Sequence, residues 1–141
     1  MVSGVLMSIR PAYADAILDG TKTVELRRRR PSFAEGTRVL IYSSTPHRHV
    51  RGSFEAGAVL AAAPDQLWLQ VGDRAGVDRD TFDAYFNGCA VAYGIEVRNP
   101  RRLPPRRLRI RPPQSYLFLR RGVPGHSGLV RLACATQTPG A

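Results

Sequence analysis

The stretch GTKTVELRRRR at residues 20–30 places a lysine, a carboxylate and an arginine within six positions. Lys22 is the only lysine in the chain, and the other twenty basic residues are all arginine. Glu25 and Arg27 are two residues apart in a segment that reads as a strand, so their side chains point to the same face. Lys22 comes from a turn just before that strand, which leaves the direction of its side chain open.

These three residues have the chemistry to bind an anionic or amide-bearing ligand. Arg27 offers a planar fork for a phosphate or a carbonyl edge. Glu25 can accept a hydrogen bond from an exocyclic amine or a sugar hydroxyl, or it can hold Lys22 in place. The alternative is a solvated strand face with ordinary ion pairs, each of which stabilises a protein by about 0–1 kcal/mol. The single lysine at this position favours the binding site.

Hydroxyl and amide side chains near the predicted strand ends are further candidates for ligand binding: Ser8, Tyr42, Ser43, Ser44, Gln114 and Ser115. The hydroxyl groups at 42–44 suit a phosphate or a base edge. The amide at 114 follows two prolines, and a side chain presented by such a stiff turn suits base-edge recognition. Hydrogen bonding within a turn at the strand end explains the hydroxyl groups at 42–44 equally well. Closing one end of the barrel explains the amide at 114 equally well.

The charge of the chain indicates a polyanionic partner. The 141 residues carry 21 Lys and Arg against 11 Asp and Glu, a net charge of +10, and nucleic acid is the commonest polyanion for a small basic domain. Two arginine clusters supply the expected phosphate contacts: Arg28, Arg29, Arg30, Arg107 and Arg109. Tyr42 and Tyr116 can stack on a base in an unpaired strand. The alternatives are two unrelated solvated surfaces and a charge raised by arginine-rich coding alone.

Other chemical classes lack their signatures in this sequence. We find no P-loop, dinucleotide glycine pattern or zinc signature, and the pair His47 and His49 has no third or fourth ligand nearby. We therefore expect no metal and no cofactor. No signal peptide or membrane-length apolar run is present, so we expect a cytoplasmic protein with no membrane partner. The sequence gives no sign of an oligomeric state.

Six short strands are expected from apolar runs and alternation, at residues 4–9, 23–29, 38–44, 49–61, 91–97 and 114–120. Three helices are expected at 10–19, 64–71 and 78–88, with Gly20 ending the first and Asp78 capping the third. Prolines between residues 98 and 113 argue against a central strand there and leave a short edge strand around Leu108 and Ile110. This pattern predicts an α+β fold, a small, mostly antiparallel β-barrel with two or three short helices packed on it.

The domain organisation follows from the same pattern. Residues 1–120 are expected to form one domain, and residues 121–141 a C-terminal extension. The apolar run at 129–135 reads as one last strand, and the final TQTPGA reads as a disordered tail. In the helix at 78–88, Phe82, Tyr85 and Phe86 form an apolar stripe that is expected to face the core.

The sequence resembles the ASCH domain, a member of the PUA-like superfamily of small β-barrels. The family pattern G-x-K-x-x-E-x-R is matched by Gly20, Lys22, Glu25 and Arg27. The same order of elements recurs in the segments SIRP (8–11), VLIYSSTP (39–46), GSF (52–54), LW (67–68), FDAYFNG (82–88), AY (92–93) and PPQSY (112–116). The resemblance covers about residues 4–119. Within the family, the sequence looks most like the small prokaryotic proteins described as predicted transcriptional regulators.

The resemblance implies a cleft lined by the G-x-K-x-x-E-x-R strand and an RNA- or nucleotide-binding function, which includes a regulatory role. It favours RNA over DNA as the partner, with a nucleoside as the second ligand class. Some members of the family are enzymes, either amidohydrolases acting on N4-acetylcytidine or ribonucleases, so a hydrolase using Lys22 and Glu25 is the alternative. In the amidohydrolases a threonine nucleophile stands where this sequence has Glu25. A carboxylate beside Lys22 is expected to favour the charged ammonium, which is a poor base. A protein–protein adaptor is the third hypothesis.

Overall fold

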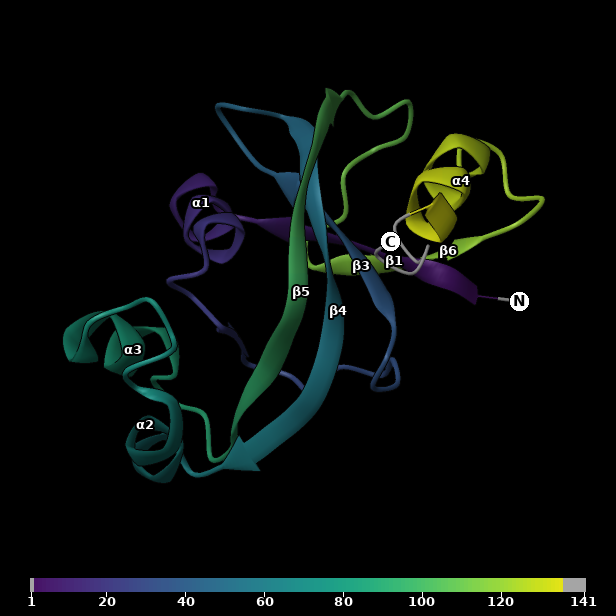
Figure 1. Ribbon diagram of the computed structural model, residues 1–141. Helices are drawn as coiled ribbons and strands as arrows, with labels where there is room; N and C mark the ends of the chain where they lie inside the picture. The colour runs from purple at the N-terminus through teal and green to yellow at the C-terminus, as the bar shows by residue number, and fades with distance from the viewer. Residues whose placement is uncertain (1, 136–141) are drawn as a thin grey trace.

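The computed structural model describes residues 2–135, which form six strands and four helices (Figure 1). The strands are β1 (Val2–Ile9), β2 (Val24–Arg27), β3 (Arg38–Ser43), β4 (His49–Ala62), β5 (Ala92–Arg106) and β6 (Tyr116–Arg120). The helices are α1 (Pro11–Asp19), α2 (Pro64–Val71), α3 (Arg79–Tyr85) and α4 (Ser127–Ala135). None of these helices is long and apolar enough to cross a membrane.

All six strands belong to one mixed sheet with the order β2-β5-β4-β3-β1-β6. β1 and β3 pair in parallel, and the other neighbouring pairs are antiparallel. The α+β class is confirmed, but the expected barrel is not closed, because no pairing joins β2 to β6 within the described residues. The long β4–β5 pair contains three register shifts, and bulges of this kind bend a sheet strongly without closing it.

β5 continues through the proline-rich segment, which corrects the expectation drawn from those prolines. β2 pairs with β5 only at residues 93–96, so the rest of β5 has one free edge. Pro100, Pro104 and Pro105 fall between the residues that pair with β4, and a missing backbone N–H does no harm at such positions. Leu108 and Ile110 lie beyond the strand, where they pack against a core cluster instead of forming an edge strand.

Residues 127–135 form a helix, α4, and not the last strand expected at 129–135. Leu129, Val130 and Ala133 are buried against Leu6 and Leu40 of the sheet. Their spacing of one and four residues suits a helix face, whereas a short apolar run alone fits either structure. The expected disordered tail lies outside the described residues, and the division at residue 120 stays a prediction.

Two helices lie beside the start of β2, and residues of α3 form part of one wall of the site. Leu67 of α2, Phe82 of α3 and Phe86, which follows α3, share a core cluster with Val24 of β2, and Figure 1 shows both helices together at one end of the β4–β5 pair. The expected N-cap of α3 is confirmed, because the Asp78 carboxylate accepts a hydrogen bond of 2.8 Å from the backbone N–H of Thr81.

Candidate functional site

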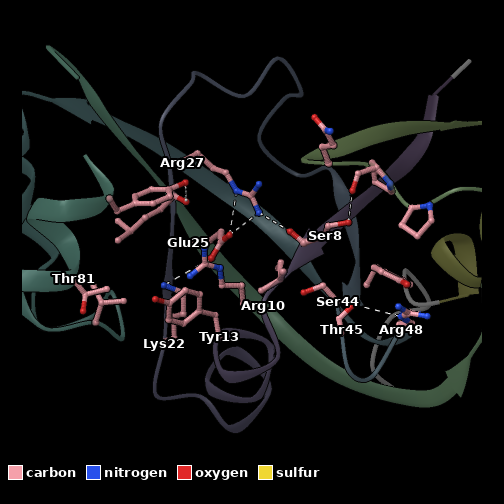
Figure 2. A pocket seen from close by; sticks show the side chains of 18 of the residues that line it. Ser8, Arg10, Tyr13, Lys22, Glu25, Arg27, Ser44, Thr45, Arg48 and Thr81 are labelled. Carbon is pink, nitrogen blue, oxygen red and sulfur yellow. Dashed lines mark hydrogen bonds and ion pairs between the residues drawn. The ribbon is translucent and has the colours of Figure 1, made fainter. Parts of the chain in front are cut away.

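A cleft of about 1140 Å³ opens between α3, the start of α1 and the end of β2 on one side and the 107–114 segment on the other. Figure 2 shows Thr81 of α3 at one side of this cleft and Arg48, from the turn between β3 and β4, at the other. Glu25, Arg10 and Ser8 lie between them. The cleft therefore collects residues that are up to 106 positions apart in the sequence, from Ser8 to Gln114.

Lys22 forms part of the floor of the cleft and is almost fully buried, with 1% of its surface exposed. Its Nζ donates a hydrogen bond to the Ala75 carbonyl, lies 3.8 Å from Glu25 Oε1, and lies 5.0 Å from the centre of the Tyr13 ring. Gly76 packs directly on its stem, since a Cβ at that residue would lie 2.9 Å from Lys22 Cβ. The turn between α2 and α3 thus determines where the ammonium sits.

Burial lowers the pKa of Lys22 below its ordinary value, because a charged ammonium is poorly solvated there. Glu25 opposes this effect and Arg27 adds to it, and the result is a lowered pKa. The expectation that Glu25 makes Lys22 a poor base was therefore incomplete, because the sequence did not reveal the burial. The lysine is closer to releasing its proton than an exposed lysine would be.

This lowered pKa predicts a specific dependence of stability on pH. Unfolded lysine has a pKa near 10.5, so between the folded and unfolded values the unfolded state binds more protons and the free energy of unfolding rises with pH. Below that window Lys22 is charged in both states, and the folded state carries the full free-energy cost of burying the ammonium. We expect the wild type to gain stability relative to Lys22→Met as the pH is raised toward 10.5. Denaturant unfolding of both proteins at several pH values measures the difference, and a constant difference would contradict the assignment.

Glu25 and Arg27 form a close ion pair beside Lys22. Arg27 donates from Nη2 and Nε to Glu25 Oε2, at 2.7 and 3.1 Å. Nη2 also reaches the Ser8 carbonyl at 3.2 Å, and Nη1 reaches the Ser115 hydroxyl at 3.1 Å. Glu25 is 5% exposed. The carboxylate is thus held between two cations, and Arg27 connects β2 to β1 and to the residue preceding β6.

The other predicted hydroxyl and amide residues divide into three groups. Ser8, Tyr42, Ser44 and Gln114 line the cleft, although the Ser8 hydroxyl already donates to the Pro113 carbonyl at 2.6 Å. Ser115 lies outside the main cleft and contacts Arg27. Ser43 does not line the cleft. It is buried, and its hydroxyl oxygen lies 2.9 Å from His47 Nδ1.

The predicted phosphate contacts divide in the same way. Arg28, Arg29 and Arg30 line a second hollow of about 480 Å³, together with Arg27, Tyr85, Gln114, Ser115 and Tyr116. Arg107 lines the main cleft. Arg109 lines neither of these two hollows. Arg28–Arg30 and Arg107 therefore line two different hollows, which share Arg27, Tyr85 and Gln114 as lining residues.

Several residues of the cleft were not predicted from the sequence, including Arg10, Tyr13, Arg48, Thr81 and Tyr85. Tyr85 was assigned to the core, but it is 39% exposed and its hydroxyl donates to the Leu26 carbonyl at 3.2 Å. Partial burial raises the pKa of Tyr85, so the phenol stays protonated at neutral pH. Helical spacing places Tyr85 on the same face as Phe82 and Phe86. That spacing does not show which residue of the face lies at its exposed edge.

Metal ligands do not gather in the part of the chain that the structure describes. Within residues 2–135, no group of three or more His, Cys, Asp and Glu side chains is placed to hold an ion. The rings of His47 and His49 are 5.9 Å apart, and His47 is engaged with Ser43.

The fold and the cleft define a small, basic α+β domain with a buried charge cluster under an arginine-edged depression. The chain belongs to the ASCH family, because the ASCH domain matches residues 7–101. It is 32% identical over 124 residues to an ASCH domain-containing ribonuclease of Zymomonas mobilis, a match that spans 82% of the chain and 84% of the relative.

Solved structures give the same relationship. The crystal structure of the ASCH protein from Zymomonas mobilis has a TM-score of 0.83 at 28% identity and covers 97% of the chain and 96% of the relative. A tyrosine-to-phenylalanine variant of that protein also has a TM-score of 0.83, at 27% identity, covering 97% of the chain and 99% of the relative. These relatives give no support to the expected subgroup of transcriptional regulators.

Proposed function

We propose that the protein is a ribonuclease that binds single-stranded RNA in the cleft. The observation that carries this proposal is the charge cluster of Lys22, Glu25 and Arg27, which forms part of the wall of a cleft edged by Arg10, Arg48 and Arg107. Such a site combines a proton-transferring carboxylate with cations for a phosphate. The name of the Zymomonas mobilis relative supports RNA cleavage in particular.

The size of the cleft favours a strand over a single nucleoside. Ligand pockets for small molecules have volumes of about 300–1,000 Å³, and this cleft of about 1140 Å³ shares Arg27, Tyr85 and Gln114 with a second hollow. Tyr42 and Tyr85 line it and offer faces or hydroxyl groups to unpaired bases. An unpaired strand can present its bases to these side chains, whereas the bases of a duplex are stacked and paired inside the helix.

Within this proposal, Glu25 is the proton acceptor for the attacking hydroxyl. Arg27 holds one carboxylate oxygen, and Lys22 lies 3.8 Å from the other. Lys22 is buried under Tyr13 and acts as a positioning residue, because its ammonium lies beside the Glu25 oxygen that Arg27 leaves free. Arg10 and Arg48, which make no ion pair with a carboxylate in residues 2–135, are the groups that meet the phosphate.

Hydrolysis of N4-acetylcytidine is the second candidate function, favoured by the lowered pKa of Lys22. A lysine with a lowered pKa can serve as a general base for a hydroxyl nucleophile. Thr23 does not line the cleft, so Thr81 and Ser44 are the hydroxyl groups that would have to supply the nucleophile. This candidate therefore depends on hydroxyl groups outside the motif.

One experiment separates these functions. Wild type, Lys22→Ala and a matched surface variant, Arg121→Gln, are purified identically and incubated with an end-labelled single-stranded RNA and with N4-acetylcytidine, with and without added divalent ions. We expect RNA cleavage by the wild type and by Arg121→Gln, and at least about a 10-fold loss in Lys22→Ala. Equal cleavage by all three proteins would indicate a contaminating nuclease and contradict the proposal. RNA binding without turnover would identify a binding protein, and release of acetate would identify the amidohydrolase.

A further inference from the structure

The side chain of Gln114 lies where the two hollows meet. The main cleft and the hollow of Arg28–Arg30 share three lining residues, which are Arg27, Tyr85 and Gln114. Gln114 is exposed, and no hydrogen bond engages its amide group within residues 2–135. Neither hollow is lined by the other Asn and Gln residues of that part of the chain, Gln66, Gln70, Asn87 and Asn99. The two hollows therefore hold a single amide side chain, and its polar atoms are free for a ligand.

The other two shared residues already use their polar groups to hold the fold. Arg27 makes four hydrogen bonds, and the Tyr85 hydroxyl donates to the Leu26 carbonyl at 3.2 Å. The Tyr85 ring is 39% exposed, whereas Tyr42, which lines only the main cleft, is 6% exposed. At the junction, Tyr85 thus offers an aromatic face and Gln114 offers free hydrogen-bonding atoms.

The backbone on both sides of Gln114 is fixed to β1. The Ser8 hydroxyl donates to the Pro113 carbonyl at 2.6 Å, and the Ser8 backbone N–H donates to the Ser115 carbonyl at 2.9 Å. The Ser115 hydroxyl also accepts a hydrogen bond of 3.1 Å from Arg27 Nη1. A side chain presented from such a fixed segment loses less conformational freedom when it binds a ligand. Gln114 is therefore preorganised, although it is exposed.

We propose that Gln114 makes the cleft selective for adenine, by hydrogen bonding to the edge of a base that stacks on Tyr85. The inference rests on the proposed function and deepens it, because it assigns a base preference to the nucleotide beside the cleaved linkage. Arg27 connects the two places, since its guanidinium holds Glu25 and also holds Ser115, the neighbour of Gln114.

The chemistry of the amide selects adenine among the four bases. A glutamine side chain presents one acceptor beside a pair of donors. Adenine presents the complementary pattern at N7 and the N6 amino group, whereas guanine presents two acceptors at the same edge and the pyrimidines have no N7. Stacking on an aromatic ring accepts every base. The choice of base therefore falls to Gln114 and not to Tyr85.

A short single-stranded RNA of random sequence tests the preference. We expect the wild type to cut beside adenine about 10-fold more often than beside any other base, as one bidentate contact to a base edge provides. Sequencing of the strands that the protein retains on a filter measures the same preference without turnover. Equal cutting beside all four bases would overturn the assignment and leave the proposed ribonuclease standing. Retention enriched in adenine without any cutting would overturn the ribonuclease and support the assignment, and neither retention nor cutting would overturn both.

Three single variants locate the preference at residue 114. Gln114→Met keeps the length of the side chain without its polar atoms, and we expect the preference for adenine to fall to within about twofold of the other bases. Gln114→Glu has only acceptors, and we expect the preference to move toward cytosine, whose N4 amino group donates to a carboxylate. Gln70→Met is the matched control, because Gln70 is exposed on α2 and lines neither hollow. A preference for adenine that persists in Gln114→Met would overturn the assignment.

Discussion

Replacing Glu25 with glutamine is expected to lower RNA turnover by at least about 100-fold, the smallest contribution typical of a general base. Glutamine has nearly the same shape, but it cannot take up a proton from an attacking hydroxyl. The substitution also replaces the charged carboxylate that accepts from Arg27 with a neutral amide group. Cleavage of an end-labelled RNA measures the loss, and turnover within tenfold of the wild type would contradict the role of Glu25.

The same substitution is expected to destabilise the protein, which allows a control. Without the carboxylate, the buried Lys22 ammonium loses its counter-ion and the partly buried Arg27 guanidinium loses its partner; breaking a buried ion pair in this way costs about 3–5 kcal/mol. The double variant Lys22→Met with Glu25→Gln removes one of the two cations and should recover most of that stability without recovering turnover. Denaturant unfolding gives the stabilities, and recovery of both properties together would show that Glu25 acts only through the fold.

The spacing of the G-x-K-x-x-E-x-R motif predicted part of the site geometry but not the burial of its lysine. The period of two along a strand correctly placed Glu25 and Arg27 on one face, and both line the cleft. The burial of Lys22 was not predictable, because it depends on the Ala75 carbonyl and on Gly76, more than fifty residues further along the chain. The sign of the change in the lysine pKa depends on that burial. Local spacing therefore identifies which residues meet, but distant contacts determine their protonation.

The errors in the predicted fold also arise from contacts between distant parts of the chain. Prolines were expected to stop β5, yet its free edge makes their missing N–H groups harmless. The run at 129–135 is too short for periodicity to separate a strand from a helix, and its packing on Leu6 and Leu40 selects the helix. Most of the other elements began and ended within about two residues of their expected positions, because caps and turns such as Asp78 and Gly20 act locally.

The arginine of the motif is expected to be irreplaceable even by lysine. In Arg27→Lys the charge is kept, but a lysine cannot hold Glu25, the Ser8 carbonyl and the Ser115 hydroxyl at once, since its three donors share one nitrogen. We expect a destabilisation of about 2–3 kcal/mol, as for one lost hydrogen bond to a charged group. We also expect about a 100-fold loss of kcat/KM, because the side chain at residue 27 no longer joins β2 to the Ser8 carbonyl of β1 across the cleft.

Ser115→Ala is the matched control for that prediction. It removes one of the four hydrogen bonds of Arg27 and leaves those to Glu25 and Ser8 in place. If Arg27 acts by joining the walls of the cleft, the alanine variant should lose little turnover while the lysine variant loses nearly all. If Arg27 served only as a positive charge near the phosphate, Arg27→Lys would keep most of its activity and its salt slope would be unchanged. Turnover and salt dependence measured on both variants therefore distinguish a structural bridge from a simple cation.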